Sequence, residues 1–213
     1  DEHGNSLSYH NVHALCMDGD DLWIGTYTGG VNVLNTKTGV FRVYTTKAGD
    51  PTTLDRSSSY AIFKDREARI WVTSMSGVNL YNREEDNFTR IRDLGSWIMD
   101  IDQDADGNIW FSSQGNGLFK YDPDKQEWTN YVHSSAPGAL INDQVNCVLI
   151  DGNGEMWIGT MNGLCKYNAK EDQFELIPLD IPSRNICAII EDQRVLWLTT
   201  TKGLVRYVPG ESC

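Results

Sequence analysis

Oxygen-bearing side chains crowd two short segments, and their spacing is that of a calcium-binding loop. "DQDADGN" at positions 102–108 places acidic residues at alternate positions before a glycine, as the start of such a loop does. The twelfth position, however, is Ser113, where a bidentate glutamate is expected. "DGNGE" at positions 151–155 is a similar segment. We therefore interpret both as turns between strands, with occasional calcium binding as the alternative, and predict no metal site.

Catalytic patterns are not found in this sequence. The four histidines lack the spacing of a metal-binding motif such as H-E-x-x-H, and no serine stands in a G-x-S-x-G segment. No pair of carboxylates stands out from the turn positions as a glycosidase pair. We predict no catalytic residues and no cofactor, and so expect that this chain is not an enzyme.

Composition and charge narrow the possible partners. The 213 residues are 40% hydrophobic and 23% charged, which suffices for a packed core. A net charge of −12 disfavours nucleic acid and anionic membranes, both of which need basic surfaces. No apolar run reaches the 18 or so residues of a membrane helix, and the first residues do not resemble a signal peptide. We expect a soluble chain, either cytosolic or a mature exported piece, without membrane contact. Buried free thiols are expected at four of the five cysteines, Cys16, Cys147, Cys165 and Cys187.

The elements that must position any site come from an internal repeat. "LWIGT" near the start of the chain returns as "MWIGT", and three related segments also carry a tryptophan at the same place. A glycine and a short alternating run follow each tryptophan, and an apolar run ending in an acidic turn precedes it. In four repeats a further run such as "FRVY" or "FELI" closes the unit. The repeated tryptophans are Trp23, Trp71, Trp110, Trp157 and Trp197.

Each repeat therefore contains four short runs rich in β-branched and aromatic residues, separated by Gly, Asp and Asn. Such units, recurring about every 40–48 residues, predict an all-β fold, a β-propeller of four-stranded antiparallel blades with about five repeats present. The repeated tryptophans are then expected in the core between blades. The glycines after them are expected to allow the turn between the second and third strands.

The pattern D-G-N/D-x-x-W-I-G-T-x-x-G-L-x-x-Y-N/D, followed by F-x-x-Y, resembles the two-component regulator propeller repeats over the whole chain. This resemblance implies a periplasmic sensor region of a Bacteroides-type hybrid two-component system. Such a sensor detects oligosaccharides and signals to a histidine kinase, which lies outside this chain, in a parent protein anchored in the inner membrane. The resemblance also implies that the parent sensor dimerises or self-associates.

Propellers of this family usually have seven blades, which would need roughly 300 residues at this repeat length. We therefore interpret residues 1–213 as a single domain or a fragment of a larger propeller, with a closed five-bladed ring as the alternative. The fifth repeat lacks its fourth run, since the chain stops at "RYVPGESC". Sheet edges and apolar blade faces of an open fragment would favour association between chains.

Ligands are expected on the face where the second-to-third-strand loops meet the connections between repeats, because loops on a rigid scaffold usually carry binding. Trp97, in "LGSWIMD", stands where the other repeats have polar residues, and it could stack on the C–H face of a sugar ring. The alternative is that Trp97 only fills a gap beside a short connection. Cations on this face would suit a carboxylated or sulfated sugar. The predicted ligand-binding residues are Trp97, Arg56, Arg184, His10, Tyr27, Gln114 and Lys202.

Two other functions remain open. Lyases related to streptogramin-inactivating proteins use similar repeats, and such an enzyme would need a cluster of histidine and acid side chains with a divalent metal. A protein-interaction scaffold without a small ligand is the third possibility.

Overall fold

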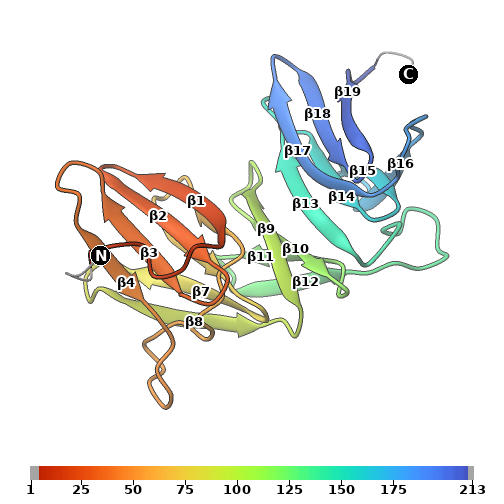
Figure 1. Cartoon of the computed structure of the whole chain (residues 1–213). Helices are drawn as coiled ribbons and strands as arrows, with labels where there is room; N and C mark the ends of the chain where they lie inside the picture. The colour runs from red at the N-terminus through yellow and green to blue at the C-terminus, as the bar shows by residue number, and fades with distance from the viewer. Residues whose placement is uncertain (1–4, 211–213) are drawn as a thin grey trace. The chain divides into compact units, whose positions relative to one another are not determined.

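The structure is a computed structural model that describes residues 5–210. It is all β: nineteen strands form five antiparallel sheets, each with its strands in sequence order (Figure 1). Four sheets have four strands and the last has three. The predicted fold class, a β-propeller of four-stranded antiparallel blades, is confirmed, and so is the incomplete fifth repeat.

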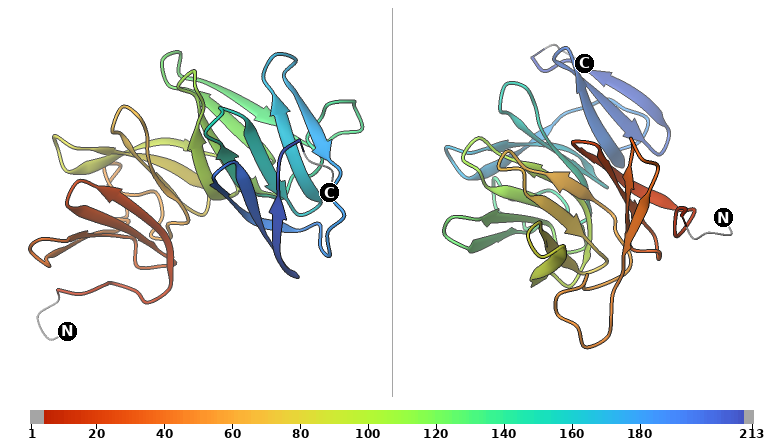
Figure 2. Two further views of the ribbon diagram at one scale, coloured as in Figure 1. Left: turned by 90° about the horizontal axis from the view of Figure 1, so that it is seen from above. Right: turned by 90° about the vertical axis from the view of Figure 1, so that its left-hand side faces the viewer.

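The chain divides into two compact units, residues 1–98 and residues 99–213, which are described separately below. Figure 2 shows the same sheets from two further sides. Unit 1 holds the first two blades and the first two residues of strand β9. The first blade contains β1 (Val12–Asp18), β2 (Asp21–Thr26), β3 (Val31–Asn35) and β4 (Phe41–Tyr44). The second contains β5 (Ile62–Lys64), β6 (Ile70–Thr73), β7 (Gly77–Asn82) and β8 (Asn87–Asp93).

Unit 2 holds the remaining blades. The third contains β9 (Trp97–Gln103), β10 (Ile109–Gln114), β11 (Leu118–Asp122) and β12 (Glu127–Tyr131). The fourth contains β13 (Val145–Ile150), β14 (Met156–Thr160), β15 (Gly163–Asn168) and β16 (Gln173–Ile177). The fifth contains β17 (Ile186–Asp192), β18 (Val195–Thr200) and β19 (Gly203–Tyr207).

The cores lie between blades and are built around the repeated tryptophans. In unit 1, Trp23 packs with Val33 of its own blade and Ile62 of the next. In unit 2, Trp110 packs with Val148 and Ile158 of the fourth blade, and Trp157 packs with Leu198 of the fifth. The tryptophans of the first four repeats are at most 2% exposed, as predicted. Trp197 is only half-buried.

Glycines follow the second strands for a steric reason. Gly30 and Gly117 have φ values of 78° and 76°, which favour glycine. A Cβ atom at either would collide with a backbone oxygen of the blade's last strand, that of Tyr44 or Tyr131. The predicted turn role is therefore confirmed for these two positions.

The expectation for the cysteines is partly wrong. Cys147 and Cys165 are buried, but Cys16 is only half-buried and Cys187 is exposed. Cys187 is exposed because it stands at an irregular position of β17, where the pairing with β18 shifts between Ile186 and Ala188.

Candidate functional site: a rim of bulge residues

A β-bulge marks the start of the innermost strand in three blades. In β1, Val12 pairs with Thr26 and Ala14 with Gly25, so that His13 between them is left without a partner. The same shift sets apart one residue in β13 and one in β17. Bulges redirect side chains and are common beside binding sites, so the residues at this position are candidates for ligand contact. In each repeat this position lies five residues before the aspartate at the end of the first strand or directly after it. The residues at this position are His13, Tyr60, Met99, Asn146 and Cys187.

In unit 1 the bulge residue His13 and the equivalent Tyr60 belong to a continuous row of rings. His13 stacks on Tyr27 with 5.9 Å between ring centroids and meets the ring of Tyr60 edge-on at 4.9 Å. Tyr60 in turn stacks on Trp97, with centroids 5.7 Å apart and an angle of 17° between the planes. We call these four residues the aromatic row. It connects two predicted ligand-binding residues, Tyr27 and Trp97, through two that sequence reasoning missed.

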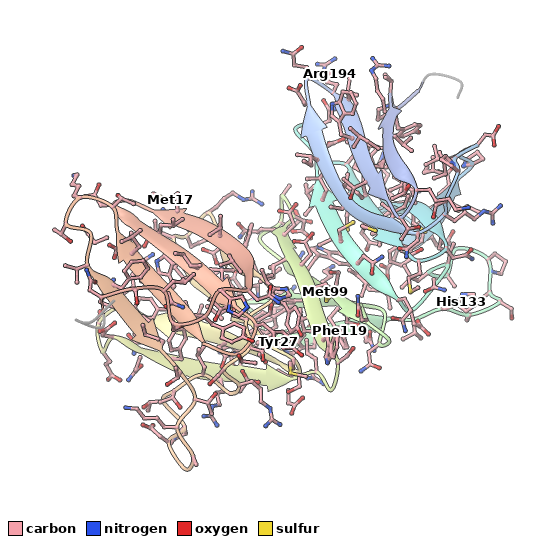
Figure 3. The ribbon with its side chains drawn as sticks, in the orientation of Figure 1. Met17, Tyr27, Met99, Phe119, His133 and Arg194 are labelled. Atoms are coloured by element: carbon pink, nitrogen blue, oxygen red, sulfur yellow. The ribbon has the colours of Figure 1, made fainter. Side chains whose placement is uncertain are left out.

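The two ends of the aromatic row are open to solvent. Tyr27 is 38% exposed and Trp97 is 42% exposed, whereas Tyr60 between them is only 7% exposed. Trp97 is therefore not a buried gap filler, although its inner face is covered by Tyr60. Tyr27 can be located in Figure 3, where it is labelled just after β2.

The Tyr60 hydroxyl has no hydrogen-bond partner within residues 5–210, although its oxygen is buried. Burial, followed by the neighbouring Tyr27, raises the pKa of Tyr60 above its usual value, so the hydroxyl keeps its proton at neutral pH. A buried hydroxyl without a partner costs free energy. A ligand oxygen that accepts a hydrogen bond from this hydroxyl could offset the cost.

In unit 2 the corresponding positions form a row of amides. Gln114 donates to Asn146 Oδ1 at 3.4 Å, and Asn146 donates from Nδ2 to Asn185 Oδ1 at 2.9 Å and to the Ile186 carbonyl at 2.8 Å. Gln114 was predicted as a ligand residue, and Asn146 was missed. The repeat position that holds His13 and Tyr60 in unit 1 therefore holds an amide, Asn146, in the fourth repeat.

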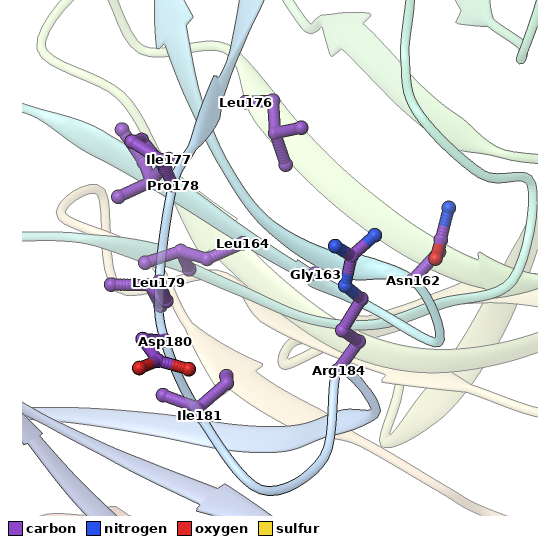
Figure 4. Close-up of a pocket in the computed structure, with 10 residues that line it drawn as sticks. All are labelled: Asn162, Gly163, Leu164, Leu176, Ile177, Pro178, Leu179, Asp180, Ile181 and Arg184. Atoms are coloured by element: carbon purple, nitrogen blue, oxygen red, sulfur yellow. The ribbon is translucent and has the colours of Figure 1, made fainter.

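The remaining predicted residues are found in other surroundings. His10 is exposed and stacks on Tyr9, with centroids 4.7 Å apart. Lys202 is exposed in the loop between β18 and β19. Arg184 lines an apolar pocket of about 390 Å³ beside β16, shown in Figure 4. Arg56 lines a second pocket, in unit 1, together with Arg90 and Arg92.

The acidic turns use their carboxylates within the chain. Asp104 accepts hydrogen bonds from the backbone N–H groups of Asp106 at 3.0 Å and Asn108 at 2.9 Å, and from the Trp110 indole at 2.7 Å. Asp151 has an equivalent set of donors. These bonds support the interpretation of both segments as turns. Residues 5–210 contain no group of three His, Cys, Asp or Glu side chains arranged to hold a metal ion.

Sequence comparisons match two of the repeats to a known family. The family model described as "Two component regulator propeller" matches residues 6–28 and 139–162. Among curated proteins, Histidine kinase P4 of Formosa agariphila is 29% identical over 187 residues, which cover 81% of this chain and 13% of that kinase. Two segments of this chain, in the first and the fourth repeat, therefore match the two-component regulator propeller repeat.

Structure comparisons agree on the fold. The extracellular domain of a hybrid two component system from B. thetaiotaomicron is similar with a TM-score of 0.82 and 24% identity, over 96% of this chain and 28% of that one. A catalytically inactive virginiamycin B lyase from Staphylococcus aureus is similar with a TM-score of 0.70 and 11% identity, over 98% of this chain and 73% of that one. At these identities the likeness shows a shared propeller fold. The chain spans under a third of the kinase and of the extracellular domain.

Proposed function

We propose that this chain is the ligand-binding part of an extracytoplasmic sensor in a hybrid two-component system. It detects an oligosaccharide and signals to a histidine kinase outside the chain, in a parent protein anchored in the inner membrane. The repeat family and the similarity to a histidine kinase and to the extracellular domain of a two component system support this proposal. The described residues contain no helix with the length and apolarity needed to cross a membrane.

The observation that carries the binding proposal is the aromatic row, and in particular its exposed end, Trp97. A sugar ring presents an apolar C–H face and polar edges, so its recognition needs a flat aromatic surface beside hydrogen-bonding groups. Trp97 supplies the surface, held in orientation by its stack on Tyr60. The Tyr60 hydroxyl supplies a donor close to it.

Such a sensor acts through binding alone. A ligand shifts a signalling equilibrium only when its affinity differs between the two states of the sensor. The side chains in the aromatic row come from β1, the β2–β3 loop, the segment before β5 and the start of β9. A ligand that contacts several of these segments can favour one arrangement of them over another.

The test is calorimetric titration of the purified chain with neutral and acidic oligosaccharides, with light scattering to establish its mass. Trp97→Ala is expected to weaken binding at least tenfold while lowering the free energy of unfolding by only about 0.5–1.5 kcal/mol, because the ring is partly exposed and loses its stack on Tyr60. Trp157→Ala is the matched control. It is expected to cost about 3–5 kcal/mol of stability, because that ring is 2% exposed and leaves a cavity.

Unaltered binding by Trp97→Ala, together with a loss of stability like that of Trp157→Ala, would show that Trp97 only packs. Metal-dependent turnover of a streptogramin would instead favour the lyase alternative. The absence of both ligand and turnover would favour an interaction scaffold.

A further inference from the structure

Three arginines meet in one pocket of unit 1, although the chain as a whole carries a net charge of −12. We infer that this pocket binds an oxyanion of the ligand, a sulfate ester or a carboxylate. The inference rests on the proposed function and adds the ligand's chemical class to it. We call this the arginine pocket. It has a volume of about 360 Å³ and is lined by Asp55, Arg56, Ser76, Val78, Arg90, Arg92 and Asp93.

The arginine pocket lies on the face where ligands are expected. Arg56 belongs to the connection between β4 and β5, and Ser76 to the loop between β6 and β7. Arg90 and Arg92 lie on β8, whose end leads through a short connection to Trp97. The volume falls within the roughly 300–1,000 Å³ typical of small-molecule sites.

Strand β8 contains a further β-bulge, which lies between the two of its arginines that line the pocket. In the pairing of β7 with β8, Val78 faces Arg92 and Asn79 faces Arg90, so that Ile91 is an extra residue. Such an insertion bends the strand and redirects its side chains. Repeat periodicity alone does not reveal the insertion.

Two of the charged residues in the pocket, Asp55 and Arg90, form hydrogen bonds with uncharged groups of unit 1. Asp55 accepts hydrogen bonds from Ser74 Oγ at 2.7 Å and from Asn79 Nδ2 at 2.6 Å, so its carboxylate is held by neutral groups of the blade. Arg90 donates to the carbonyl oxygens of Thr53 at 2.9 Å and Leu54 at 3.1 Å, which are uncharged acceptors.

Three guanidinium groups and two carboxylates line the arginine pocket. Arg56 is exposed and forms no hydrogen bond or ion pair with the part of the chain that the structure describes. The planar fork of a guanidinium fits the paired oxygens of a carboxylate or sulfate better than an ammonium does.

The fourth repeat shows that the blade does not need these arginines. Its pocket beside β16 lies at the corresponding place, and Figure 4 shows its apolar lining. By strand pairing, Leu176 corresponds to Arg90 and Ile177 to Arg92, because Leu164 faces Ile177 where Val78 faces Arg92. One scaffold thus carries an apolar pocket in one repeat and a cationic pocket in another. A blade with this strand arrangement is therefore formed without arginines at these two positions of its last strand.

The experiment compares three probes by calorimetry at constant ionic strength: a disaccharide with one sulfate ester, its desulfated counterpart, and a uronic acid disaccharide. We expect one of the two anionic probes to bind at least tenfold tighter than the neutral one, and which of them does so identifies the oxyanion. The double variant Arg56→Gln/Arg92→Gln should abolish this difference. Both side chains are exposed, so the variant should remain folded. Leu176→Gln, in the apolar pocket, is the control and should leave the preference unchanged.

Equal affinities for all three probes, or a preference for the anion that survives in the double variant, would overturn the inference. If neutral and anionic probes bind equally and Trp97→Ala weakens both, the proposed function stands and the arginine pocket falls. A second measurement tests the pocket independently of oligosaccharide binding: the NMR shifts of the arginine Nε–H groups are followed while inorganic sulfate is added. Saturable shifts at Arg56 and Arg92, without binding of any disaccharide, would keep the pocket and refute oligosaccharide sensing. If the shifts and disaccharide binding are both absent, the inference fails.

Discussion

Spacing between an aspartate and the repeated tryptophan decides whether the two side chains bond. Where six residues separate them, the carboxylate accepts the indole N–H. These pairs are Asp65 with Trp71 at 2.7 Å, Asp104 with Trp110 at 2.7 Å, and Asp151 with Trp157 at 2.9 Å. In the first repeat the separation is five, and Asp18 instead pairs with Lys64 and Arg83 of the next blade. The indole nitrogen of Trp23 is then buried without a partner within residues 5–210.

This difference predicts unequal effects of two aspartate substitutions in unit 2. Asp151→Ala removes the acceptor of two backbone N–H groups and of the buried indole, so it should lower the free energy of unfolding by about 1–3 kcal/mol in urea titrations. Asp192→Ala is the matched control. Asp192 is exposed and stands five residues before Trp197, and we expect a change within about 0.5 kcal/mol. Equal losses in both variants would show that the aspartate acts only through the turn.

At the residue scale, the sequence located part of the candidate site. Trp97 and Tyr27 were predicted from repeat positions, and the structure joins them in one row. Tyr60 was missed because it looks like one more apolar residue before a strand, and only the ring contacts reveal its place. Arg90 and Arg92 were missed because an exposed strand arginine resembles an ordinary solvated charge. That the predicted residues bind a ligand stays a prediction.

At the element scale, the repeats predicted strands well and irregularities poorly. Alternating apolar runs and turn residues sufficed to place four strands in each repeat. A bulge inserts one residue without changing composition, so neither the one at His13 nor the one at Ile91 could be predicted. Both irregularities lie at the two places where we propose that a ligand binds, His13 in the aromatic row and Ile91 between two arginines of the arginine pocket.

Strand β9 differs from the other first strands by two aspartates that bond the edge of β13. Asp100 accepts the Val148 N–H at 3.1 Å, and Asp102 accepts the Ile150 N–H at 2.6 Å. Burial is the main cause that raises the pKa of Asp100 to about 7, and the nearby Asp102 adds to it. The blade contact therefore includes a carboxyl group that titrates near neutral pH.

The pH dependence of this contact has a definite sign. Because the folded-state pKa of Asp100 is raised, its contribution to stability is fully present below the unfolded value of 3.8 and is lost as the pH rises through about 7. Asp100→Asn cannot ionise. Relative to wild type, it should therefore gain about 1–3 kcal/mol in free energy of unfolding between pH 5 and pH 8. Urea titrations at the two pH values measure this gain. Asp124→Asn, at an exposed turn position, should run parallel to wild type, and a parallel profile for Asp100→Asn as well would refute the prediction.

At the scale of the whole molecule, the first and last blades expose apolar side chains. The residue after the glycine that precedes each third strand is at most 1% exposed in four repeats, whereas Leu204 in the fifth is 63% exposed. Leu15 and Met17 on β1 are also exposed. Figure 3 labels Met17 at the end of β1. Apolar side chains in such positions favour association with another blade-like surface. That residues 1–213 form one propeller domain or a part of a larger one stays a prediction.

Self-association is therefore the last prediction. The purified chain should form dimers or larger species at high concentration in sedimentation equilibrium, and Leu204→Gln should shift the chain toward monomer, because it removes an exposed apolar side chain from the interface. The matched control is Leu164→Gln at the equivalent position of the fourth repeat. Leu164 is fully buried, so that variant should lose at least about 2–5 kcal/mol of stability. A wild-type chain that stays monomeric at every concentration, or association that Leu204→Gln leaves unchanged, would show that the exposed face of the fifth blade makes no contact between chains.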